Sequence, residues 1–554
     1  MELLVDIFGF VSILLHGAAT TLQSVALGGT CVLLALALPL RAELGAAFGQ
    51  IERGARRITM ACAFGLVLVA LVNMLLKSLV VMGTASLGWL DLVGANFVNA
   101  SLIKIAAALA LGLLCRVPLE DSRRVTLVLA AVAVLVGSAL TSHSVGRVDG
   151  RGFLYVSSLL HQAGAAIWIG GIPAFLVALH HARDGHLARI IGRRYSLISM
   201  AGVGILLAAG IAMTVPYTGG LEPEAMIGTA YGAMLTTKIF IFVCILCLGA
   251  ANFFLVERLR RDPATPFIRL RRFAEVELGV GISIFFMAAS LTSLPPAVDL
   301  TQDRATIAEV AERMTPRWPT LMSPDRNQLA ISELQGKLDA VRAGAPVDER
   351  PRAYVPGSGV PVPRNAHDIA WSEYNHHWAG IIVLAIGLMA LLEKTGRAPW
   401  ARHWPLLFLL LAAFLFVRSE AEGWPFGQFT LAESLRDPEY VQHKLFMVLI
   451  TGFSAFEWSV RTGRLTRPWA QYIFPLICAF GAMMLLTHAH AIDNVKELLL
   501  IEITHLPLAV FGMASGWARW LELRLPAPDN RLPGWIWPVC FCMVGLILIA
   551  YRES

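Results

Sequence analysis

Residues 230–256 read AYGAMLTTKIFIFVCILCLGAANFFLV and contain one charged side chain, that of Lys238. A helix needs about 20 predominantly apolar residues in a row to cross the hydrocarbon core of a bilayer. The apolar run is continuous, whereas the strands of a membrane β-barrel alternate between apolar and polar residues. The segment therefore predicts a membrane-spanning helix.

The whole chain follows the same pattern. Of its 554 residues, 56% are hydrophobic and 15% are charged, against about 45–50% and about 25% in soluble domains. We expect an all-α polytopic membrane protein with about fourteen transmembrane helices in an eight-plus-six arrangement. The predicted domains are an eight-helix domain (1–296), an external linker (297–370) and a six-helix domain (371–554). The apolar segments lie near residues 22–40, 58–82, 97–115, 124–143, 153–179, 196–216, 230–256, 273–295, 372–392, 404–418, 440–459, 470–487, 498–518 and 534–551.

Basic residues alternate between the two sides of these segments. The loops on one side hold 26 Lys and Arg, and the short loops and termini on the other side hold six. Because basic loops stay in the cytoplasm, both termini are predicted to be periplasmic. The net charge of +6 is thus explained by topology, and no nucleic-acid partner is expected.

Residues 297–370 are polar and lie outside in this topology. We expect short amphipathic helices over Asp303–Met314 and Asp325–Arg342, and an extended Pro/Gly-rich stretch from Pro346 to Pro363. Long external segments cross the membrane regardless of their charge, so this one is consistent with the orientation. It could cover or gate the outer ends of the helices, or dock a periplasmic carrier.

Three histidines of the first domain fall near the outer ends of different helices. His16, His143 and His161 could meet in the outer leaflet, and Met213 and Met287 reach similar positions. Imidazole and thioether are ligands that copper accepts, so these five residues are candidate metal ligands. The alternative is that each histidine bonds a neighbouring carbonyl and that the methionines are core filler.

The second domain offers further outer histidines on four helices. Haem needs two axial imidazoles from facing helices, and copper needs two or three close nitrogens. The spacing of these histidines in the sequence does not distinguish between the two cofactors. The alternative is solvated interfacial histidines. The candidate cofactor ligands are His376, His377, His443 and His505, and the further candidate metal ligands are His488 and His490.

Glu277 is an acidic residue in an apolar span, where a central charge is costly. It lies close in sequence to Arg271 and Arg272, which favours a structural ion pair over a gate. The chain has no P-loop, Rossmann or HExxH motif, so a hydrolase or an ATP-driven pump is disfavoured.

Residues 153–297 resemble the CopD family of copper-resistance membrane proteins. The resemblance follows four successive helices and covers about a quarter of the chain. It implies copper handling in the bacterial inner membrane and marks Trp168, Lys238 and Glu277, together with His161, as family-pattern positions. The matching stretches are His161…Trp168-Ile-Gly170-Gly171, Arg194-Tyr195-Ser196 leading to Gly210, Thr229-Ala-Tyr231-Gly232…Leu235-Thr-Thr-Lys238 ending at Asn252, and Arg271-Arg272…Glu275/Glu277 ending at Pro296.

The sequence leaves three hypotheses open. The first is an inner-membrane protein that takes up or hands over copper from the periplasmic side without ATP. The second is a b-type haem electron carrier between a quinol and a periplasmic acceptor, and the third is a structural subunit of a larger membrane complex. A Soret band in the visible spectrum would separate the second hypothesis from the first.

Overall fold

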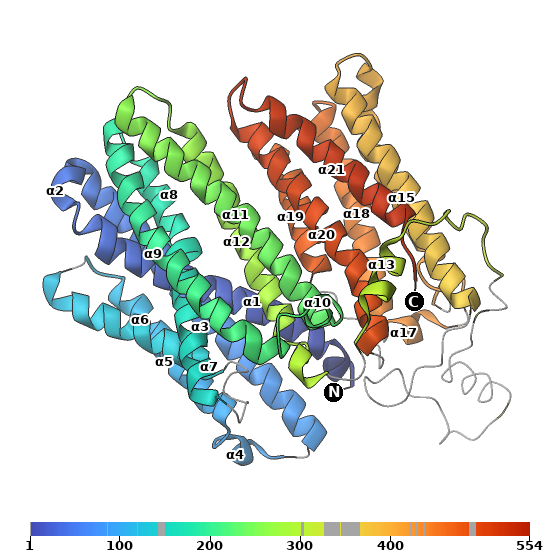
Figure 1. Cartoon of the computed structure of the whole chain (residues 1–554), viewed down its shortest axis with the longest axis horizontal. Coiled ribbons are helices and arrows are strands. Elements are labelled where there is room, and N and C mark those ends of the chain that lie inside the picture. The colour runs from blue at the N-terminus through green and yellow to red at the C-terminus, as the bar shows by residue number, and fades with distance from the viewer. Residues whose placement is uncertain are drawn as a thin grey trace. The chain divides into compact units, whose positions relative to one another are not determined.

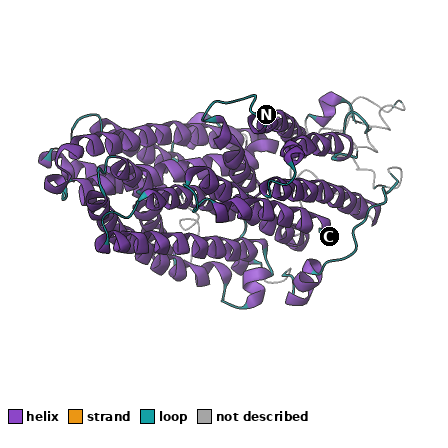
Figure 2. Ribbon diagram, turned by 90° about the horizontal axis from the view of Figure 1, so that it is seen from above, coloured by secondary structure: helices purple, strands orange, loops and turns teal. Residues whose placement is uncertain are grey.

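The computed structural model describes residues 2–85, 87–118, 120–141, 150–300, 304–325, 329, 344, 366–421, 423–427, 429–435, 438–486 and 495–553. The structure is 81% helical, and helices and loops alone make up the part that is described (Figure 2). The predicted all-α polytopic membrane fold is therefore confirmed.

Helices fall on every apolar segment that the sequence predicted (Figure 1). Ten described helices or helix pairs are long and apolar enough to cross a membrane. Two apolar helices, Arg124–Leu140 and Ala470–Leu485, are shorter. The exact number of crossings and the side of each terminus stay predictions.

Contacts divide the chain into two compact units. The N-terminal unit comprises Val11–Ala225 and Leu235–Asp299, and the C-terminal unit comprises Met1–Phe10, Met226–Met234 and Leu300–Ser554. Helices α1 (Glu2–Val32), α10 (Pro223–Ile227) and α11 (Ala230–Arg261) therefore contribute residues to both units.

The N-terminal unit is built from long helices, and two π-helices interrupt their regular geometry. A π-helix, η1 (Leu33–Ala37), ends α1, and a second, η5 (Ala166–Gly170), separates α7 from α8. The main helices are α1 (Glu2–Val32), α3 (Phe48–Ala85), α5 (Asn96–Leu114), α6 (Arg124–Ala139), α7 (Arg151–Ala165), α8 (Ile172–His180), α9 (Gly185–Thr218), α11 (Ala230–Arg261) and α12 (Ile268–Leu291), with short α2 (Arg41–Leu44), α4 (Trp89–Leu92) and α10 (Pro223–Ile227) between them.

Glycines bring α1 against η5. A Cβ atom at Gly170 would lie 1.9 Å from the Ser24 carbonyl oxygen, and one at Gly28 would lie 2.2 Å from the carbonyl carbon of Gly170. Membrane helices gain little from hydrophobic burial against one another, so backbone approach over small residues supplies much of their packing. This close approach fixes the depth of Trp168, which lies inside η5.

The C-terminal unit contains α13 (Ile307–Met314), α15 (Ala366–Lys394), η9 (Pro399–Leu406), α16 (Leu407–Arg418), α17 (Leu431–Ser434), α18 (Pro438–Arg461), α19 (Ile473–Leu485), α20 (Val495–Arg524) and α21 (Arg531–Ile549). Helices α15 and α21 pack closely, because a Cβ atom at Gly545 would lie 2.5 Å from the Leu384 amide nitrogen. Trp404, Phe474 and Trp537 are fully buried and form an aromatic core, with ring centroids 5.5–5.8 Å apart.

Residues 297–370, predicted to be external, contain one of the two expected amphipathic helices among the described residues. Helix α13 starts after Thr306, whose hydroxyl accepts a hydrogen bond from the Glu309 amide in a capping box. This cap explains why the helix begins four residues later than the predicted Asp303. Most of Asp325–Arg342 and all of Pro346–Pro363 lie outside the described residues.

Candidate functional site

Imidazoles from three helices of the C-terminal unit gather beside the C-terminal segment. The His376 ring of α15 stacks on Tyr551 at 3.8 Å between centroids, and the His505 ring of α20 lies 6.1 Å from His376 and 5.7 Å from Tyr551. His443 of α18 is close enough to His376 to interact with it electrostatically. Three of the predicted cofactor ligands therefore share one site.

Hydrogen bonds fix the tautomers of two of these rings. The Nδ1 atom of His376 lies 2.9 Å from the Ser372 carbonyl oxygen, and His443 Nδ1 contacts the Glu420 carboxylate. Both oxygens only accept hydrogen bonds, so Nδ1 carries a hydrogen in each ring, and Nε2 of a neutral His376 ring keeps its lone pair. Metal-binding histidines typically donate their second nitrogen to a carbonyl or carboxylate in this way.

His377 differs from its neighbour, because both of its nitrogens are occupied. Nδ1 accepts a hydrogen bond from the Thr320 amide at 2.7 Å, and Nε2 donates to the Tyr551 carbonyl oxygen at 2.8 Å. The side chain is 3% exposed. His377 thus ties α15 to Thr320 and to the C-terminal segment, and neither of its nitrogens is left for a metal.

Carboxylates complete the surroundings of the histidine site. Glu553 accepts hydrogen bonds from the Tyr551 hydroxyl at 2.8 Å and from the Ser372 hydroxyl. Arg313 of α13 donates to the Arg552 carbonyl oxygen at 2.9 Å, which holds this segment in place. Among the described residues, no three His, Cys, Asp or Glu side chains stand in metal-ligating geometry. His488 and His490 lie outside the described residues.

In the N-terminal unit, His161 has the same tautomer as His376, with the hydrogen on Nδ1. Its Nδ1 lies 3.1 Å from the Leu206 carbonyl oxygen, and Lys238 is near enough to interact with the ring electrostatically. A Cβ atom at Gly210 would lie 3.3 Å from the ring carbon Cε1. The family-pattern residues His161 and Lys238 are therefore brought together.

The other predicted ligands of this unit have different environments. His16 is exposed on α1, Met213 is half-buried on α9, and Met287 is fully buried in α12. His143 lies outside the described residues. The roles of these four residues stay predictions.

Trp168 and Glu277 form a second polar site, deeper in the N-terminal unit. The Trp168 indole nitrogen donates to Glu277 Oε1 at 2.6 Å, and Asn252 Nδ2 donates to Glu277 Oε2 at 3.0 Å. The Tyr195 hydroxyl donates to the Trp168 carbonyl oxygen at 2.6 Å. Sequence reasoning gave Asn252 and Tyr195 no role, although both lie in the stretches that resemble CopD proteins.

The predicted ion pair between Glu277 and the nearby arginines is wrong. Arg272 pairs with Glu275, and Arg271 lies 4.0 Å from the same carboxylate. Residues three and four apart share a helix face, whereas residues five and six apart do not. Glu275 therefore takes the arginines, and Glu277 points to the opposite side.

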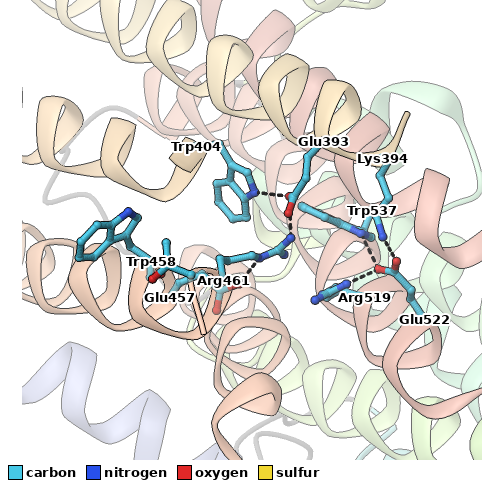
Figure 3. A network of polar contacts seen from close by, with 10 residues as sticks. Glu393, Lys394, Trp404, Glu457, Trp458, Arg461, Arg519, Glu522 and Trp537 are labelled. Carbon is cyan, nitrogen blue, oxygen red and sulfur yellow. Dashed lines mark hydrogen bonds and ion pairs between the residues drawn. The ribbon is translucent and has the colours of Figure 1, made fainter. Parts of the chain in front are cut away.

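A network of charged residues, which the sequence did not predict, lies in the C-terminal unit (Figure 3). Glu393 accepts from the Trp404 indole at 2.9 Å and from Arg461 at 2.7 Å. Arg461 also donates to Glu457 at 2.8 Å. The Arg461 guanidinium lies over the Trp404 and Trp537 rings, 4.9 and 5.5 Å from their centroids.

The second branch of this network is centred on Glu522. Its carboxylate accepts from the Trp537 indole at 2.8 Å and from Arg519 at 2.5 Å, and it pairs with Lys394 (Figure 3). Trp537 connects the two branches, because Arg461 and Arg519 both lie over its ring. These charges lie near helix ends, where they resemble ordinary loop charges in the sequence.

Part of this chain is similar in sequence to proteins named for copper resistance and copper transport. Residues 189–291 match the family described as CopD, copper resistance protein D, which confirms the resemblance seen in the sequence. The chain is 31% identical over 165 residues to the copper transport protein CutJ of Bacillus subtilis (strain 168). That alignment covers 29% of each chain, so it spans less than a third of the relative's length. No solved structure matches this chain.

Proposed function

We propose that this multi-pass membrane protein binds copper from the periplasmic side of a bacterial inner membrane and takes up or hands over the ion without ATP. The observation that carries the proposal is the site of His376, His443 and His505. The His376 ring keeps the lone pair of Nε2 for a metal while the Ser372 carbonyl oxygen holds its Nδ1, and the Glu420 carboxylate orients the His443 ring. The similarity of the N-terminal unit to copper proteins supports the same function.

Imidazole suits Cu(I) and Cu(II), and a site formed by three helices can change its coordination when the helices shift. His161 offers a second imidazole of the same tautomer in the N-terminal unit. We propose that it serves as a further copper ligand, with His16, Met213 or Met287 as candidate partners. The external segment, whose Thr320 contacts His377, is where a periplasmic copper carrier would dock.

Metal analysis of the purified protein tests this proposal. We expect wild-type protein to bind stoichiometric copper in competition with a Cu(I) chelator and to show no Soret band. The His376→Ala and His443→Ala variants should each lose copper affinity. His367→Ala should retain it, because His367 is exposed in the first turn of the same helix, α15.

Two outcomes would overturn the proposal. Unchanged copper affinity in both variants would remove the C-terminal histidine site. A Soret band in protein that lacks copper would instead favour the b-type haem electron carrier.

A further inference from the structure

Glu277 is a buried acid to which the proposed copper sites give no role. Its side chain lies on α12 and is 5% exposed, and its two hydrogen-bond partners, Trp168 and Asn252, are 3% and 8% exposed. At 1.5 Å per residue, Glu277 lies about 13 Å from the start of α12, and Asn252 about as far from the end of α11. The site therefore lies about two to three turns inside both helices rather than at their ends.

Both donors to Glu277 are electrically neutral. Its nearest arginines are engaged with Glu275 at the start of α12, and no ion pair of Glu277 occurs among the described residues. The titratable group that faces it is Tyr195 on α9, whose hydroxyl is directed to the Trp168 carbonyl oxygen, and Cys31 on α1 lies near Tyr195. Nothing in this surrounding compels Glu277 to keep a negative charge.

The Asn252 amide matches both protonation states of the acid. In the observed orientation, Nδ2 donates to Glu277 Oε2, and Oδ1 is buried without a hydrogen-bond partner. An unsatisfied buried acceptor is costly. If the amide rotates by half a turn, Oδ1 accepts a hydrogen bond from a protonated Oε2, so one rotation adapts the site from carboxylate to carboxylic acid.

The backbone at this site is also irregular. Trp168 lies within the π-helix η5, a type of insertion that is frequent at functional sites. The Tyr195 hydroxyl bonds the Trp168 carbonyl oxygen, so α9 holds the same turn. The indole that donates to Glu277 is therefore positioned from two helices.

We propose that Glu277 is a proton-binding site within the membrane and that its proton exchange accompanies copper movement. An O–H bond forms at Oε2 with a proton from water on one side and breaks with release of the proton to water on the other side. The coupling to copper rests on the proposed function, whereas the proton site itself does not.

Infrared difference spectroscopy tests the proton site directly. Spectra of the full chain between acidic and alkaline pH should contain a protonated-carboxyl band that is absent in Glu277→Gln. The matched control is Glu275→Gln, two residues earlier on α12, which should retain the band. In Asn252→Leu, we expect the band at a shifted frequency, because the amide no longer bonds the acid. An identical spectrum in wild type and Glu277→Gln would overturn the proposal.

Proteoliposomes with a trapped pH indicator test the coupling. Copper added to wild-type vesicles should change the internal pH, and Glu277→Gln should reduce this change to the level of protein-free vesicles while still binding copper. Copper movement without proton movement in wild type would overturn the coupling and leave the copper function intact. A protein that binds no copper would instead contradict the proposed function, while the infrared result still decides the proton site.

Discussion

Arg461 is the side chain on which the charged network of the C-terminal unit most depends. It pairs with Glu393 at 2.7 Å and with Glu457 at 2.8 Å, and it lies over the rings of Trp404 and Trp537. We predict that Arg461→Gln strongly destabilises this unit. The glutamine cannot neutralise either carboxylate.

The magnitude follows from the burial of the two partners. The Glu457 side chain is 2% exposed and its Oε2 atom has no hydrogen-bond partner, so loss of Arg461 leaves a buried carboxylate without a cation. Removing one member of a buried ion pair costs about 3–5 kcal/mol. Glu393 is 23% exposed and keeps the Trp404 indole, so its share is about 1 kcal/mol or less. The expected loss in the free energy of unfolding is therefore about 3–5 kcal/mol.

Unfolding in mixed micelles of detergent and denaturing detergent, followed by circular dichroism, measures this loss. The matched control is Arg467→Gln, an exposed arginine just beyond the same helix, which should stay within about 0.5 kcal/mol of wild type. The double variant Glu457→Gln/Arg461→Gln removes both charges and should recover about half of the loss. A single variant within about 1 kcal/mol of wild type, or a double variant whose loss is the sum of the single losses, would refute the reasoning.

Three further predictions concern other contacts. The pKa of Glu309 is lowered to about 2, first by its hydrogen bond with Lys496 and then by those with Thr306. The stabilisation that Glu309 provides is therefore complete above its ordinary pKa near 4.5 and is lost as the pH falls toward 2. The melting temperature of Glu309→Gln should accordingly depend less on pH between these values than that of the wild type. Gly170→Ala should destabilise the N-terminal unit, because its Cβ atom would lie 1.9 Å from a carbonyl oxygen. The Cβ atom of Gly204→Ala would meet nothing within 4 Å, so this variant should stabilise α9 by up to about 1 kcal/mol. Equal melting temperatures of the two variants would contradict this prediction. Glu420→Gln should weaken copper binding by about 10–100-fold in a chelator competition, because the carboxylate orients a ligand histidine, and unchanged affinity would exclude that role.

The helices could be predicted from the sequence because the bilayer imposes one simple constraint. Each span must be long and apolar, and the basic loops must alternate, so both features are visible residue by residue. The boundary of α13 was missed by four residues because its start depends on the Thr306 cap. Apolar periodicity does not show where such a cap lies.

The candidate site could be predicted only in part. The residue types and the helix ends identified His376, His443 and His505, but His376 and His377 are indistinguishable in sequence. Only the structure shows that the nitrogens of His377 are both occupied, whereas Nε2 of its neighbour is free. Glu277 was misassigned because nearness in sequence was taken for nearness in space, although residues five or six apart on a helix face different ways.

Glu277 and the acids of the charged network differ in a way that bears on which of them exchanges a proton. In the network of Figure 3, Glu393, Glu457 and Glu522 are each paired with Lys or Arg, so protonating one acid breaks an ion pair and leaves a cation uncompensated. Glu277 has neutral donors, so its protonation breaks no ion pair and requires one amide to rotate. The network is thus suited to hold the ends of its helices together in one charge state, whereas the single acid is suited to change state. If infrared difference spectra showed the titrating carboxyl band to be lost in Glu457→Gln and kept in Glu277→Gln, this assignment of roles would be reversed.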